Sequence, residues 1–193
     1  MVTIPSEYNL PLCLQAITAI EADLAKLTAN LTAGQFQAPP RAGGWSIGYC
    51  IEHLILTGNA FLVKWDAAIQ TAPPGGRQNE GPFRYSWLGR VILRFAEPPY
   101  RVKIKTTRPF DPGSRRPMEE TIRRFHKMHQ EIAVRISASR GLDATRVKVR
   151  SPFASWLWYP LGLSFDLALA HERRHLWQAW QVREQLIDQE RTL

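Results

Sequence analysis

The chain has 193 residues, of which 45% are hydrophobic, and a formal net charge of +8 at pH 7. This length suits one domain, which we expect to span residues 1–193 and to bury a core large enough to fold unaided. Two cysteines are too few for a disulfide framework, and the N-terminal residues lack the basic and apolar segments of a secretory signal, so we expect a cytoplasmic protein. The basic charge leaves nucleic acid, anionic lipid and acidic small molecules open as partners.

Residues 152–170 form a long apolar run that resembles a membrane span. Pro152 and Pro160 interrupt this run, and Asp166 would place a charge inside the bilayer. The run also continues directly into the charged residues 171–175. We therefore expect a buried loop that enters a helix, and no membrane partner.

Two helices are predicted in the first 73 residues from apolar residues spaced three and four apart. The first carries the stripe Leu10, Cys13, Ile17, Ile20, Leu24, Leu27 and Leu31, and Gly34 is expected to end it. The second begins at Ser46, a good N-cap, with Trp45 expected to pack against Cys50. His53 lies at the margin of the second stripe, so its side chain can point inward.

Residues 71–116 form a connection much longer than the two to eight residues that usually join bundle helices, so we expect a crossover with a function or local order. Residues 85–95 have the pattern of a short amphipathic helix. Between Arg77 and Arg116 there are ten Lys or Arg and three acidic residues, which concentrates a net charge of +7 in this segment. No nucleic-acid-binding motif accompanies this charge.

The remaining helices are expected from about Pro117 to near Gly141 and from near Leu163 onward. Between them, residues 146–150 alternate basic and β-branched side chains, as residues 101–105 do, and these two segments could pair as a ribbon. The sequence thus predicts an all-α fold, a four-helix bundle with a long crossover between its second and third helices.

Three histidines are the candidate metal ligands. His171 and His175 are four residues apart on the inner stripe of the fourth helix, so their rings project from one face with room for an ion between them. His53 is a third inward candidate, from the second helix. Three nitrogen ligands suit zinc, nickel or a neighbouring divalent ion, and they leave a coordination position for water or substrate.

Two motifs give the sequence a family resemblance. Gly44-Trp45-Ser46-Ile47 leading to Glu52-His53-Leu54, together with residues 170–178 (AHERRHLWQ), closely resembles the DinB-like superfamily of four-helix-bundle proteins. The resemblance covers nearly the whole chain. It implies a zinc, nickel or similar divalent ion held by His53, His171 and His175. It also implies functions found among relatives: thiol S-transferase, with a low-molecular-weight thiol as cofactor, thiol-dependent isomerase, or metal-dependent hydrolase.

Several other polar residues are candidates for the site. His129 lies on the third helix's apolar stripe and is either a fourth ligand, a general base or a hydrogen-bonded core residue. Glu52 and Glu172 flank expected ligands and either orient an imidazole or lie exposed on the helix surface. The fourth helix also offers two guanidinium groups for an anionic substrate, at Arg173 and Arg174. Cys13 and Cys50 lie on apolar stripes, where burial keeps a thiol protonated, and are poor nucleophile candidates.

Three classes of function follow from these observations. The favoured one is a metal-dependent enzyme acting on a small molecule, by hydrolysis or thiol transfer, with the basic crossover drawing an anionic substrate or thiol to the metal. The second is a metal-binding or stress-response module without turnover. The third, least supported, is a nucleic-acid binder that uses residues 77–116. A homodimer is compatible with all three.

Overall fold

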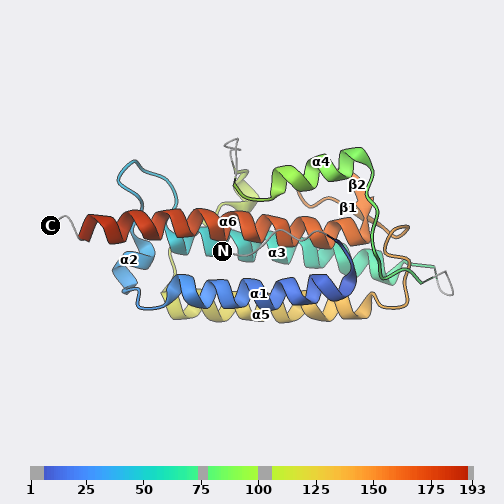
Figure 1. The fold of residues 1–193 in the computed structure, drawn as a ribbon, viewed down its shortest axis with the longest axis horizontal. Coiled ribbons are helices and arrows are strands. Elements are labelled where there is room, and N and C mark those ends of the chain that lie inside the picture. Colours follow the sequence, from blue (N-terminus) through green and yellow to red (C-terminus); the bar gives the residue numbers. More distant parts are fainter. Residues whose placement is uncertain (1–6, 74–77, 100–105, 191–193) are drawn as a thin grey trace.

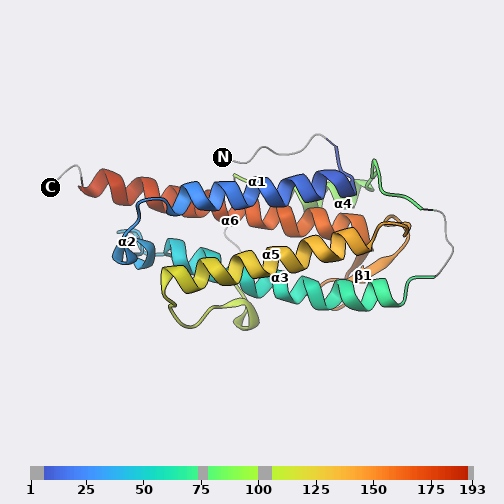
Figure 2. The ribbon, with the colours of Figure 1, turned by 90° about the horizontal axis from the view of Figure 1, so that it is seen from below.

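The computed structural model describes residues 7–73, 78–99 and 106–190. Its elements are, in chain order, α1 (Leu10–Thr28), α2 (Ala33–Gln37), α3 (Ile47–Gln70), α4 (Trp87–Ala96), the 3-10 turn η1 (Arg108–Phe110), α5 (Met118–Ala138), β1 (Lys148–Arg150), β2 (Trp158–Pro160) and α6 (Leu161–Glu190). The four long helices α1, α3, α5 and α6 lie side by side along the molecule (Figures 1 and 2). The predicted all-α, four-helix-bundle architecture is confirmed.

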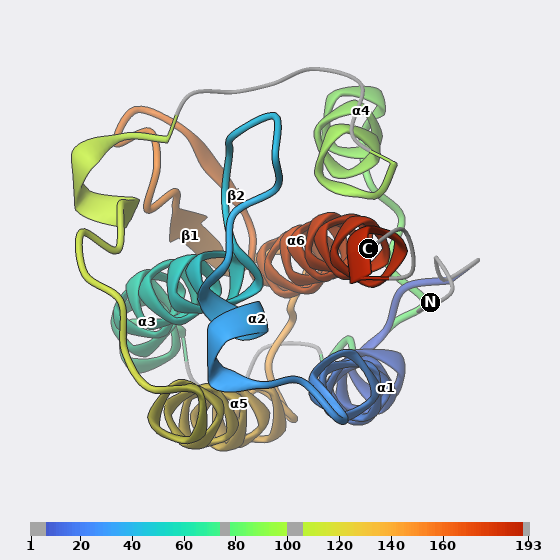
Figure 3. The ribbon, with the colours of Figure 1, turned by 90° about the vertical axis from the view of Figure 1, so that its left-hand side faces the viewer.

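The four long helices form a square in cross-section (Figure 3). α3 packs against α5 and α6, and α1 packs against the same two helices, so α1 and α3 lie on one diagonal. The predicted stripe of α1 points into this square: Leu10, Ile20, Leu24 and Leu27 are all fully buried. Burial of this apolar surface is the main source of the bundle's stability.

The direction of the helices explains the long crossover. α3 and α5 are neighbours that run the same way along the bundle, so the chain must return the whole length of α3 before α5 begins (Figures 1 and 2). A helix of 24 residues such as α3 is about 36 Å long, which a short turn does not cover. α4, the expected short amphipathic helix, lies on this return path against α6. The length of the crossover therefore has a topological cause, which the sequence analysis did not recognise.

Local signals set most helix ends, and one end differs from the prediction. Ser46 caps α3 as expected, because its hydroxyl accepts a hydrogen bond of 3.1 Å from the Tyr49 amide. α1 ends at Thr28, before Leu31, because Asn30 adopts a left-handed conformation with φ of 59°. A capping box of Thr32 and Gln35 then starts α2.

A two-stranded ribbon lies between α5 and α6. β1 pairs antiparallel with β2, and Val149 lies opposite Tyr159. The segment 101–105, which was the expected partner, lies outside the described residues. The apolar run 152–170 thus contains a strand and the start of α6, where only a loop leading into a helix was predicted. Within the described residues, no helix is long and apolar enough to cross a membrane.

Candidate metal centre

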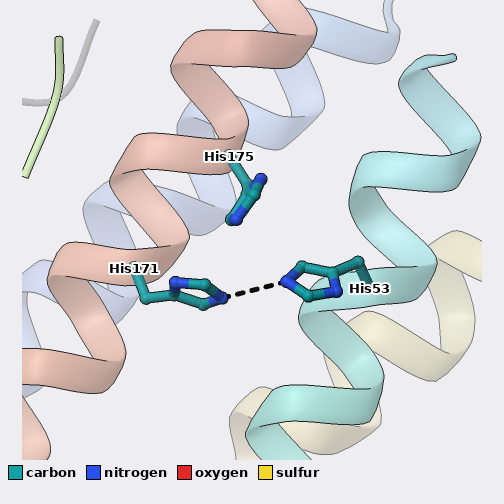
Figure 4. A group of neighbouring side chains, drawn as sticks. All are labelled: His53, His171 and His175. Carbon is teal, nitrogen blue, oxygen red and sulfur yellow. Dashed lines mark hydrogen bonds between the residues drawn. The ribbon is translucent and has the colours of Figure 1, made fainter. Parts of the chain in front are cut away.

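The three predicted histidines meet between two antiparallel helices. His53 comes from α3, and His171 and His175 come from successive turns of α6 (Figure 4). Nε2 of His53 lies 3.1 Å from Nε2 of His171, and one ring nitrogen from each of the three histidines lies within 4.8 Å of the others. The centre is nearly closed to solvent, since His53 is 5% exposed and His175 is 9% exposed, while His171 is partly exposed.

The crossover fixes the orientation of His53. Nδ1 of His53 donates a hydrogen bond of 2.7 Å to the main-chain carbonyl of Phe110, the last residue of η1. Because a carbonyl oxygen only accepts, the proton is on Nδ1 and Nε2 presents its lone pair toward the other histidines. The side chains of Tyr49 and Asp111 hydrogen-bond to each other and so tie η1 to the first turn of α3. Part of the crossover therefore supports the centre, whereas Arg101, Lys103 and Lys105 lie outside the described residues.

His175 is oriented by a neighbour on its own helix. Its Nδ1 lies 3.0 Å from Oε1 of Gln178, one turn further along α6. This hydrogen bond leaves Nε2 of His175 free to act as a ligand. Sequence reasoning missed both orienting groups. Gln178 had a signal, its spacing of three from His175 on a predicted helix, whereas a main-chain carbonyl such as that of Phe110 has none.

The two expected orienting carboxylates have other partners. Glu52 accepts hydrogen bonds from Thr121 and Arg124 of α5, the first at 2.8 Å. Glu172 lies 2.9 Å from Nε2 of His129. Each carboxylate therefore joins its helix to α5, and the rings of His53 and His175 are oriented by oxygens of Phe110 and Gln178 instead. An i±1 position points about 100° away from its neighbour on a helix, which explains why residues beside the ligands face elsewhere.

His129 is a buried partner of two acids. Besides Glu172, its ring approaches Glu21 of α1, with Nδ1 2.8 Å from the carboxylate. Burial by itself lowers the pKa of His129, but the two carboxylates outweigh it and raise the pKa to about 9. The side chain thus joins α1, α5 and α6 as a cation. It is not part of the histidine cluster, and this placement corresponds to the core interpretation of His129.

The protonation state of the three clustered histidines suits metal binding. Burial lowers the pKa of all three rings, strongly for His171 and to about 3 for His175. Mutual repulsion and the nearby charge of Arg174 lower the pKa values of His171 and His175 further. The rings are therefore neutral at pH 7, the form that coordinates a metal.

Aromatic rings enclose the cluster. The ring of Trp45 stacks on His175 at a centroid distance of 5.4 Å and lies 4.9 Å from the ring of His53, contacts that the predicted packing of Trp45 against Cys50 did not include. Gly43 and Gly44, both with positive φ, allow the turn that places Trp45 there. On another side, Phe153 lies 5.9 Å from His171 and is 48% exposed, so it borders the solvent side of the centre.

Of the other predicted site residues, Arg174 lies near the histidines, whereas Arg173 and the two cysteines are buried in the core. Arg173 is buried and paired with the buried Glu97, which removes it from substrate binding. Arg174 donates a hydrogen bond of 2.6 Å to the Phe95 carbonyl at the end of α4, and its charge reaches the histidines. Cys13 and Cys50 are free and buried, and burial raises the pKa of both thiols. Neither thiol is a nucleophile near neutral pH.

The donor set fits a divalent transition metal. Zinc–nitrogen bonds of about 2.0–2.1 Å in a tetrahedral site place ligand nitrogens about 3.4 Å apart, close to the 3.1 Å between His53 and His171. An all-nitrogen site favours zinc, nickel and their neighbours over calcium and magnesium. Two of the three rings also have the hydrogen-bonded second nitrogen that is usual for metal-bound histidines.

Comparisons with known proteins concern the fold and the family of the chain. A comparison with curated proteins gives no match. Among solved structures, YfiT from Bacillus subtilis, described as a probable metal-dependent hydrolase with an unusual four-helix bundle topology, superposes with a TM-score of 0.57. The match covers 96% of this chain and 93% of YfiT at 13% identity, which shows a common fold. The family model of the DinB superfamily matches residues 16–179. The chain therefore belongs to the DinB superfamily.

Proposed function

We propose that the protein is a divalent-metal-dependent enzyme that acts on a small molecule, as a hydrolase or a thiol S-transferase. The observation that carries this proposal is the convergence of three neutral imidazole nitrogens within 4.8 Å of one another, beside the half-exposed Phe153. Three protein ligands leave at least one coordination position for a reacting group. The description of YfiT supports the hydrolase form of this proposal.

Each part of the centre has a defined task in such an enzyme. A zinc or nickel ion on His53, His171 and His175 would lower the pKa of a coordinated water or thiol and so supply a nucleophile near neutral pH. The Phe110 carbonyl and Gln178 keep Nε2 of two ligands unprotonated. Trp45 excludes water from one side of the rings. Arg174 places a positive charge beside the centre, which favours an anionic substrate or a thiolate.

Metal content tests the first half of the proposal. Protein purified without a histidine tag should contain close to one equivalent of a divalent transition metal, and His175→Ala should lose it. His126→Ala is the matched control, because His126 is 46% exposed and pairs with Glu21 away from the cluster. Full metal occupancy in a variant with alanine at all three clustered positions would place the metal elsewhere.

Turnover tests the second half. The metal-loaded protein should be screened with activated esters and amides, and in parallel with low-molecular-weight thiols plus an electrophile. The reaction that is detected should be absent in His175→Ala. Wild-type protein stripped of metal should regain it when metal is added back, whereas His175→Ala should not. Bound metal with no metal-dependent turnover in either screen would assign the chain to the non-catalytic metal-binding class.

A further inference from the structure

α4 exposes large apolar side chains outside the bundle. This helix lies on the outer side of α6, away from the square formed by the four long helices (Figures 1 and 3). Trp87 is 72% exposed, Leu88 55% and Phe95 58%. Side chains of this size are seldom exposed together on a ten-residue helix, and such clusters mark interaction sites.

The exposed side chains share one face of α4. Trp87, Val91 and Phe95 follow one another at intervals of four residues, and Leu88 lies beside them. The opposite face, with Gly89 and Leu93 buried, packs against α6. A Cβ at Gly89 would come within 3.0 Å of the Leu163 side chain, so the helix is closely seated. The apolar face of α4 therefore points away from the bundle core.

The charged residues of α4 and of the segment before it are all basic. Arg84, Arg90 and Arg94 are exposed, and among the described residues none of them pairs with a carboxylate. No acidic residue occurs between positions 81 and 96. Glu97, the next acid, is 2% exposed and bound to Arg173, so it does not offset the arginines. An apolar face flanked by unpaired arginines suits a surface that offers both hydrocarbon and negative charge.

We propose that α4 docks the protein on an anionic lipid membrane, with Trp87, Leu88 and Phe95 in the headgroup region and the arginines on lipid phosphates. Trp and Phe favour this interfacial region, and each nearby arginine adds attraction to anionic lipids. The sequence alone led us to expect no membrane partner. Sequence periodicity does not reveal that this face of α4 is exposed. Its exposure is the reason for proposing contact with the membrane surface.

Two other occupants fit the face less well. A second copy of the chain would bring two sets of the same arginines together in an isologous contact, and one face of a ten-residue helix offers far less than the roughly 800 Å² per partner of a stable dimer. Nucleic acid would use the arginines but would leave the apolar side chains exposed, because its outer surface is charged phosphate.

Vesicle binding by the full chain tests the proposal. The wild type should cosediment with vesicles containing phosphatidylglycerol and phosphatidylcholine, and much less with pure phosphatidylcholine. Trp87→Ser with Phe95→Ser should reduce the partition coefficient at least fivefold, and so should Arg90→Ser with Arg94→Ser. Two controls on other exposed surfaces should change it less than twofold: Val134→Ser, at a side chain 56% exposed on α5, and Arg123→Ser with Lys127→Ser.

Further measurements separate the proposal from its rivals. Equal binding to neutral and anionic vesicles, or equal loss in the α4 variants and in the controls, would overturn it. A dimer in light scattering that dissociates when Trp87 and Phe95 are replaced would identify a second copy as the occupant. DNA binding at physiological salt that is lost with the arginines but retained without the aromatic side chains would identify nucleic acid. Either result would replace the lipid assignment.

Discussion

The orientation of the clustered imidazoles depends on single neighbouring oxygens. Gln178 accepts from Nδ1 of His175 at 3.0 Å. Replacing Gln178 with leucine should weaken zinc binding about 10–100-fold, the usual cost of losing such a partner. Competition with a chromophoric chelator measures the dissociation constant. Gln181→Leu is the control, because the Gln181 amide bonds only with Glu184 among the described residues. Equal affinities in the two variants would mean that Gln178 does not orient the ligand.

His129 should make the stability of the metal-free protein depend on pH. Its folded-state pKa of about 9 lies above the ordinary value near 6.5, so its contribution is complete below pH 6.5 and is lost as pH rises through 9. The loss is on the order of 3 kcal/mol. Urea unfolding of the wild type should show this decrease between pH 6 and pH 9.5, and His129→Gln should show a flatter profile. If the stability of His129→Gln depends on pH as strongly as that of the wild type and of the surface control His126→Gln, His129 is not the group responsible.

At the scale of elements, α2 is seated on α3 through a glycine. A Cβ at Gly48 would lie 2.6 Å from Cε1 of Phe36, a ring with no exposed surface. Gly48→Ala gains up to about 1 kcal/mol of helix propensity but costs about 1–3 kcal/mol of overpacking, so a net loss of stability is expected. Chemical denaturation gives the difference. Gly34→Ala, where the nearest atom would be 3.8 Å away, should be neutral or stabilising. Equal stabilities for the two variants would show that Phe36 moves aside.

The long helices and the common face of His171 and His175 were predictable because both depend on local spacing. Stripes at three and four residues predicted α1, α3, α5 and α6, and the same rule brought His171 and His175 to one face. The remainder depends on contacts between distant segments. β1 pairs with β2, which was not among the predicted strands, and the Phe110 carbonyl reaches His53 across 57 positions of sequence. A carbonyl occurs at every residue, so sequence cannot single one out.

For the whole molecule, metal removal should change stability but not the fold. The bundle core is apolar, and its buried stripes do not depend on the histidines. Circular dichroism after chelation should therefore keep its helical spectrum. The melting temperature should fall by about 5–10 °C relative to protein at a metal concentration about 100 times the dissociation constant. A collapse to random coil would show that the metal is needed to fold the chain.

The hydrogen bond from His53 to a main-chain carbonyl also determines which genetic changes the centre tolerates. A substitution at Phe110 changes its side chain but leaves the accepting oxygen in place. A single-residue insertion or deletion between Thr107 and Pro117 would shift that oxygen along the chain and misplace it. Apart from Asp111, whose side chain hydrogen-bonds to Tyr49, this stretch should therefore vary in composition among related genes while its length stays fixed. Libraries of single substitutions and single-codon deletions across it, scored by metal content, would separate these two kinds of change.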